Sequence, residues 1–112
     1  MSSARLAALE KQYATLRRQL AGIGYVSHGS VYRRPAGQSG SRFIWSSKVN
    51  NKTVSLALSE PQADWLETAI EEHRKLKKLI ADMHRISRQI MRLRFEDTER
   101  RKPLNKRVLR LI

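Results

Sequence analysis

The sequence predicts an α+β protein: an antiparallel two-helix coiled coil, with a small antiparallel β-hairpin or three-stranded meander between the helices in sequence. Two observations support this fold class. Apolar residues recur with heptad spacing in the first 20 residues and again after residue 76, as in helices that pack side by side. Between these stretches, short runs of strand-forming residues are separated by glycine, proline and asparagine.

The first predicted helix begins at Ser2 or Ser3 and ends at about Ala21, before Gly22, which is a natural helix end. Its apolar positions are spaced alternately three and four residues apart: Leu6, Leu9, Tyr13, Leu16 and Leu20. A helix of about 19 residues is marginal alone in water, so we expect it to pack on another element.

Three short strands are expected next. Residues 30–34 form the first, which Pro35 ends, and residues 42–49 are rich in strand formers. Residues 52–58 alternate between apolar and small or polar side chains, as a strand with one buried face does. Asn50 and Asn51 predict a tight turn between the last two strands, because Asn tolerates positive φ.

One long helix is expected from Ser59 to about residue 96, on the order of 50 Å in length. Ser59 and Gln62 have the spacing of a capping box, and Pro61 lies in the first turn, where it is tolerated. Its second half carries the seam on which the first helix is expected to pack: Leu76, Leu79, Met83, Ile86, Ile90 and Leu93. We expect residues 1–102 to form a single domain and residues 103–112 a basic amphipathic tail.

Apolar residues outside this seam predict a homodimer along the long helix, with the orientation of the two copies left open. They are Ile70, Ile80 and Trp65 with Leu66.

The charge balance points to a polyanionic partner. The chain has 23 Lys and Arg against 10 Asp and Glu, a net charge of +13, and residues 11–59 contain no acid. Such an excess attracts nucleic acid first and an anionic membrane second.

Two groups of cations are candidate phosphate-binding residues. The strands supply Arg33, Arg34, Arg42, Lys48 and Lys52, and one stripe of the long helix supplies Arg74, Lys78, Arg85, Arg88 and Arg92. The alternative for the stripe is a solvated helix face whose charges pair with neighbouring acids. The aromatic residues Tyr32, Phe43 and Trp45 either stack on bases beside these cations or belong to the core.

Several classes of activity have no support in the sequence. There is no cysteine, and His28, His73 and His84 lack the spacing of a metal site. No Walker-type loop and no nucleophile–base pair is present. We therefore expect a non-enzymatic protein without catalytic residues, metal or cofactor. No segment reaches 18 apolar residues and the N-terminus lacks the apolar core of a signal peptide, so a cytoplasmic protein is expected.

Three stretches resemble a small bacterial family of uncharacterised domains encoded near transposases or within mobile elements. They are Gly29-Ser-Val-Tyr-Arg-Arg34, Lys48-Val-Asn-Asn-Lys-Thr53, and His73-Arg-Lys-Leu-Lys-Lys-Leu79 within the long helix. Typical members carry a cysteine cluster where this chain has residues 36–41, Ala-Gly-Gln-Ser-Gly-Ser. The resemblance implies a mobile-element or phage setting and brings no established activity.

The leading hypothesis is a basic accessory protein that binds nucleic acid, DNA more than RNA, and assists a recombinase or transposase. The alternative is a structural coiled-coil subunit of a larger protein or ribonucleoprotein assembly. A membrane-surface role for residues 104–112 is the weakest reading.

Overall fold

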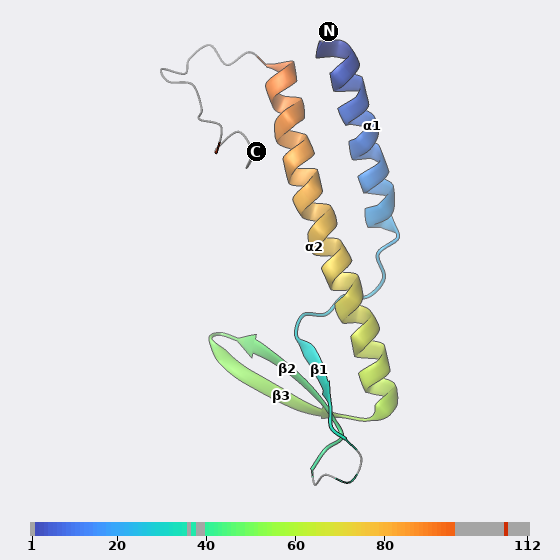
Figure 1. Ribbon diagram of the computed structural model, residues 1–112, viewed down its shortest axis with the longest axis vertical. Helices are drawn as coiled ribbons and strands as arrows, with labels where there is room; N and C mark the ends of the chain where they lie inside the picture. Colours follow the sequence, from blue (N-terminus) through green and yellow to red (C-terminus); the bar gives the residue numbers. More distant parts are fainter. Residues whose placement is uncertain (1, 36, 38–39, 96–106, 108–112) are drawn as a thin grey trace. The chain divides into compact units, whose positions relative to one another are not determined.

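The computed structural model describes residues 2–35, 37, 40–95 and 107, and it confirms the predicted α+β class with two helices and an antiparallel sheet. The elements follow in the order α1 (Ser2–Ala21), β1 (Ser30–Arg33), β2 (Phe43–Val49), β3 (Lys52–Leu58) and α2 (Glu60–Arg94), as Figure 1 shows. The predicted tail at residues 103–112 lies outside the described residues, Arg107 excepted.

The chain divides into two compact units. The helical unit comprises Met1–Gly22 and Lys77–Ile112, and the sheet unit comprises Ile23–Leu76. Helix α2 contributes to both, because its residues up to Leu76 belong to the sheet unit and its later residues to the helical unit. This division does not test whether residues 1–102 unfold as a single domain, which stays a prediction.

The three strands form an antiparallel sheet in the order β1-β2-β3. Val31 lies opposite Trp45 on β2, and Trp45 lies opposite Leu56 on β3. Asn50 and Asn51, with φ of 51° and 65°, form the two-residue turn between β2 and β3. Two positive φ values are typical of the turn whose twist matches that of a hairpin, so the turn predicted from the two asparagines is confirmed.

The two faces of the sheet have different surroundings. Arg33 forms ion pairs with Asp64 and Glu67 of α2, so the face that carries Arg33 is turned toward the helix. Side chains alternate along strands, and the pairing register places Phe43, Trp45, Val54, Leu56 and Leu58 on this inner face. The outer face carries Tyr32, Ile44, Ser46 and Lys48.

The core of the sheet unit lies between the inner face and α2. The buried apolar residues of the sheet unit are Phe43 on this face and Ala63, Ala69 and Ile70 on α2, and the Ala69 carbonyl oxygen accepts a hydrogen bond from the connecting segment. Because Ile70 is only 6% exposed within its own chain, it does not supply an exposed surface for the predicted self-association.

The segment that connects α1 to β1, residues 23–29, is held on α2. The Ser27 N–H donates to the carbonyl oxygen of Ala69 at 3.1 Å, and the Gly24 N–H donates to Glu72 Oε1 at 3.4 Å. The ring of Tyr25 lies 5.4 Å from that of Trp65.

Only Ser59 lies between the end of β3 and the start of α2, and the predicted capping box is present. The Ser59 N–H donates to Gln62 Oε1 at 2.9 Å, and the Gln62 N–H donates to Ser59 Oγ at 3.3 Å. These reciprocal bonds satisfy two donors at the start of the helix and fix the direction in which the chain leaves the sheet.

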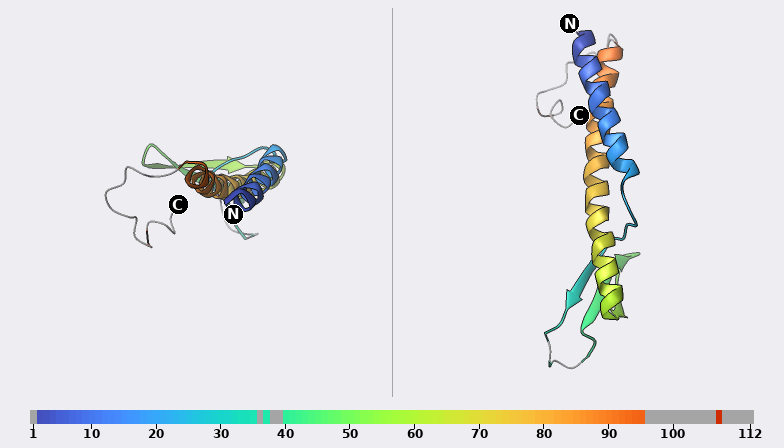
Figure 2. Two further views of the ribbon diagram at one scale, coloured as in Figure 1. Left: turned by 90° about the horizontal axis from the view of Figure 1, so that it is seen from above. Right: turned by 90° about the vertical axis from the view of Figure 1, so that its right-hand side faces the viewer.

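In the helical unit, α1 and the second part of α2 lie side by side and run in opposite directions, as both Figures 1 and 2 show. Accordingly, Glu10 in the first half of α1 forms an ion pair with Arg94 at the end of α2. Within this unit, every apolar position of the two predicted seams is buried or half-buried, but only Leu9 and Ile86 are fully buried. A coiled-coil packing of the two helices stays a prediction.

The close approach of the backbone at Gly29 to β2 can be tested by substitution. Gly29 has a φ of +99°, and a Cβ there would lie 2.6 Å from Trp45 Nε1 and 2.7 Å from the Ser46 carbonyl oxygen. Gly37 has a similar φ of +93°, but no described atom lies within 4 Å of its Cβ position.

We expect Gly29→Ala to lower the free energy of unfolding by about 1–3 kcal/mol more than Gly37→Ala does, since only the first forces a steric overlap. Both tryptophans lie in the sheet unit, so tryptophan fluorescence in a urea titration measures its unfolding. Equal effects of the two substitutions would contradict the close approach at Gly29.

Candidate nucleic-acid interface

The structure divides the predicted phosphate-binding cations between the two units. The sheet unit contains Arg33, Arg34, Arg42, Lys48, Lys52 and Arg74, and the helical unit contains Lys78, Arg85, Arg88 and Arg92. The surroundings of the two groups differ, and they decide which cations are available to a phosphate.

Arg33 is engaged by acids of its own chain. Its Nη2 lies 2.7 Å from Asp64 Oδ1 and 2.5 Å from Glu67 Oε1, and its Nε donates to Glu67 at 2.6 Å. Hydrogen bonds to Asp64 and then to Glu67 raise the pKa of Arg33 above its ordinary value. Its guanidinium also lies 5.0 Å from the centroid of the Phe43 ring. Arg33 therefore acts as a bridge between sheet and helix.

The other sheet cations do not gather into one patch. The Arg34 N–H donates to the Arg42 carbonyl oxygen at 2.6 Å, at the end of the sheet where β2 begins. Lys48 and Lys52 flank the turn at the opposite end, about 20 Å from Arg42 at 3.4 Å per residue. The alternation of side chains then places Lys48 on the outer face and Lys52 on the inner one.

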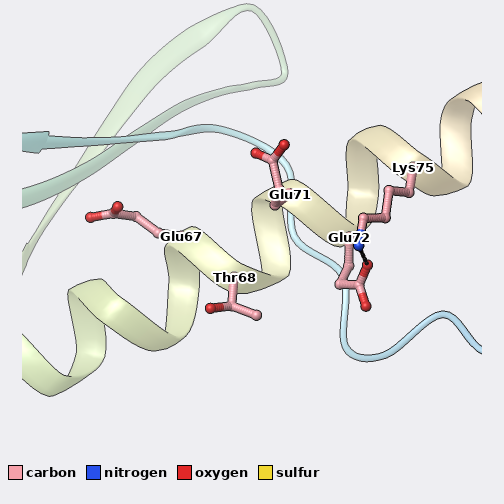
Figure 3. A pocket seen from close by; sticks show the side chains of 5 residues that line it. All are labelled: Glu67, Thr68, Glu71, Glu72 and Lys75. Atoms are coloured by element: carbon pink, nitrogen blue, oxygen red, sulfur yellow. Dashed lines mark ion pairs between the residues drawn. The ribbon is translucent and has the colours of Figure 1, made fainter.

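The first part of α2 presents an acidic surface. A shallow hollow of about 400 Å³ is lined by Glu67, Thr68, Glu71, Glu72 and Lys75, whose side chains Figure 3 shows fanning out from the helix. Arg74 pairs with Glu71 at 2.8 Å, and Lys75 pairs with Glu72 at 3.3 Å. Three carboxylates repel phosphate, so this surface is a poor place for nucleic acid.

The aromatic residues of the sheet are separated by their burial. Phe43 is buried, and Trp45 is half-buried with its Nε1–H donating to the His28 carbonyl oxygen at 3.0 Å. His28 Nδ1 in turn forms a hydrogen bond of 2.5 Å with Ser47 Oγ. Of the three aromatic residues proposed to stack on bases, only Tyr32, at 57% exposure, presents an open ring.

The helical unit carries most of the uncompensated charge. Residues 2–22 and 77–95 contain ten Lys and Arg against two acids, Glu10 and Asp82. Both acids are already paired: Glu10 with Arg94, and Asp82 with Lys78 at 3.9 Å and Arg85 at 3.7 Å. The sheet unit, by contrast, has seven Lys and Arg against five acids.

Four of the five cations of the predicted stripe lie in this unit. Lys78, Arg85 and Arg92 are exposed and Arg88 is half-buried, all on the helical segment Glu60–Arg94. At about 1.5 Å per residue, Lys78 and Arg92 lie about 21 Å apart along the axis. Such a row can contact several phosphates along one groove or strand of a nucleic acid.

No other kind of site stands out in the part of the chain that the structure describes. Its His, Asp and Glu residues form no group of three or more that could hold a metal ion. None of its helices is long and apolar enough to cross a membrane.

Comparison with protein-family models, curated proteins and solved structures finds no match. The resemblance to mobile-element domains therefore stays a prediction.

Sequence patterns could not reveal the role of Arg33, because its two acidic partners lie 31 and 34 residues away. We expect Arg33→Gln to lower the stability of the sheet unit and to leave the salt dependence of DNA binding unchanged. Arg92→Gln makes the same change in net charge, and we expect it to reduce the slope of log affinity against log salt by about 0.9. Urea unfolding and fluorescence anisotropy measure the two properties, and an equal loss of slope in both variants would contradict this assignment.

Proposed function

We propose that this chain is a non-enzymatic protein that binds nucleic acid through its helical unit. The observation that supports this proposal is the balance of ten Lys and Arg against two acids in residues 2–22 and 77–95, with both acids already paired. DNA is favoured over RNA by the resemblance to domains from mobile elements, which also makes a recombinase or transposase the proposed partner.

The proposed contacts are made by Lys78, Arg85, Arg88 and Arg92 to phosphate oxygens. Phosphate contacts give affinity without sequence preference, so binding should be strong at low salt and nearly independent of sequence. If about five phosphates are neutralised in all, the slope of log affinity against log salt on duplex DNA should be about −4 to −5.

The second candidate function is a structural coiled-coil subunit of a larger protein or ribonucleoprotein assembly. It is favoured by the half-buried seams of the helical unit, where α1 and α2 leave most apolar side chains partly exposed. In this reading, α1 and the second part of α2 pack as an antiparallel coiled coil that further helices complete. The predicted homodimer is one such completion, and light scattering during size-exclusion chromatography measures it.

The location of the nucleic-acid surface can be tested with two triple variants of equal charge. Lys78→Gln, Arg85→Gln and Arg92→Gln remove three exposed cations of the stripe. Arg5→Gln, Lys11→Gln and Arg18→Gln remove three exposed cations of α1. We expect the first variant to reduce the salt slope by about 3 and the second to leave it within about 1 of the wild-type value. Anisotropy titrations with labelled duplex DNA and duplex RNA, at several salt concentrations, measure the slopes.

Absence of salt-dependent binding by the wild-type chain would overturn the proposed function. Equal losses in the two triple variants would keep the function and reject the stripe as its site.

Asp82 provides a test in the opposite direction. Asp82→Asn releases Lys78 and Arg85 from their shared acid and should strengthen DNA binding about three- to fivefold at low salt, since an exposed ion pair contributes up to about 1 kcal/mol. Glu10→Gln makes the same change in net charge, but the cation that it releases is Arg94, which is not one of the proposed contacts. A gain in Glu10→Gln as large as that in Asp82→Asn would show that net charge alone controls affinity.

A further inference from the structure

An apolar groove runs along the helical unit between α1 and α2. It has a volume of about 230 Å³ and is lined by Tyr13, Leu20, Ile80, Met83, His84 and Ser87. Ile80 is 41% exposed. Met91 follows eleven residues later on the same side of α2 and is 51% exposed. Ile80 and Met91 are therefore about 16 Å apart along the axis, or three turns of helix, with His84 and Ser87 between them on the same side.

The opposite side of the helix pair is different in character. A second hollow of about 260 Å³ is lined by five polar residues, Gln12, Thr15, Gln19, Asp82 and Arg85, together with Leu16 and Ile86. Side chains of this kind are satisfied by water. A row of half-exposed Leu, Ile and Met side chains is not, so the apolar groove is the side on which an additional element gains most by packing.

The shape of the groove fits a helix. Its α2 wall is built from Ile80, Met83, His84 and Ser87. Ile80, His84 and Ser87 recur every three or four residues, and Met91 continues the same side of the helix one turn beyond Ser87. A third helix laid in such a channel inserts its own apolar stripe between the ridges of the other two. An extended strand would leave its backbone N–H and C=O groups facing apolar side chains.

The charges around the groove select the partner. Arg17 lies on α1 between Tyr13 and Leu20, and Lys77 lies one turn before Ile80; both are exposed. Glu10, one turn before Tyr13, is held by Arg94. Residues 2–22 and 77–95 of a second copy would bring ten more Lys and Arg against these cations, which like-charge repulsion opposes. An acidic helix meets complementary charge instead.

We propose that this groove is a docking site for an amphipathic helix of a partner protein, with an apolar stripe and acidic flanks. The site is separate from most of the proposed nucleic-acid surface, because Ile80 and Met91 lie on a different side of α2 from Lys78, Arg85 and Arg92. Arg88, about 60–80° from Met91 and Ile80, lies between these two sets. On an ideal helix, with about 100° per residue, the two sets are separated by about 100° or more. The protein can then hold a nucleic acid and a protein partner at the same time.

Three synthetic peptides of 21 residues test the proposal. The first has leucine at heptad spacing and glutamate on its flanks, the second has lysine in place of glutamate, and the third has the composition of the first with the leucines scrambled out of register. Each carries a fluorescent label, and anisotropy measures its binding to the full chain at two salt concentrations. We expect binding of the first alone.

The matched variants are Ile80→Gln with Met91→Gln in the groove, and Val54→Gln with Leu56→Gln on the sheet. All four side chains are about 40–54% exposed, so neither double variant should alter the fold. We expect the groove variant to weaken binding of the acidic peptide at least tenfold and to bind DNA as the wild type does. The sheet variant should bind the peptide normally.

Three outcomes would overturn the proposal. The first is equal binding of the scrambled peptide, which would mean attraction by net charge alone. The second is undiminished peptide binding by the groove variant. The third is a wild-type dimer, seen by light scattering, that the groove variant dissociates and that the acidic peptide does not, which would make a second copy the occupant.

Discussion

The contact of Arg33 with Asp64 and Glu67 is the interaction on which the arrangement of the sheet unit depends. Side chains alternate between the faces of a strand, so fixing one residue of β1 toward the helix fixes the face of every residue paired with it. Phe43 is buried on the face of Arg33, and Tyr32 and Lys48 lie on the face turned away from α2. An exposed ion pair contributes little free energy by itself, so it acts together with the burial of Phe43 to fix which residues the sheet offers to a partner.

The acids of α2, two of which pair with Arg33, also explain which unit has positive charge available to a polyanion. The five acids of the sheet unit are concentrated within α2, at Glu60, Asp64, Glu67, Glu71 and Glu72. Four of them, all but Glu60, are paired with cations of the helix or the sheet in ion pairs that the described residues form. The sheet unit is therefore close to neutral, and the attraction for polyanions comes mostly from the helical unit.

Structural features that depend on residues close together in the sequence could be predicted from it. The capping box of Ser59 and Gln62, the Asn50-Asn51 turn and the apolar seams depend on neighbours within one or two turns of chain. The pairing of Arg33 could not, because its acids come after the sheet in sequence. Residues 11–59 contain no acid and so resembled an uncompensated basic surface, although α2 supplies the counter-charges of Arg33. The burial of Ile70 within its own chain could likewise not be predicted from helical periodicity.

A single residue, Ser59, separates β3 from α2. This short connection couples the register of the sheet to the rotation of the helix about its axis. One inserted residue would turn the helix by about 100° relative to the strand, and would carry Asp64 and Glu67 away from Arg33. Changes of chain length between relatives of this protein should therefore be absent at this junction and should accumulate in the connection between β1 and β2, where no helix has to be kept in phase.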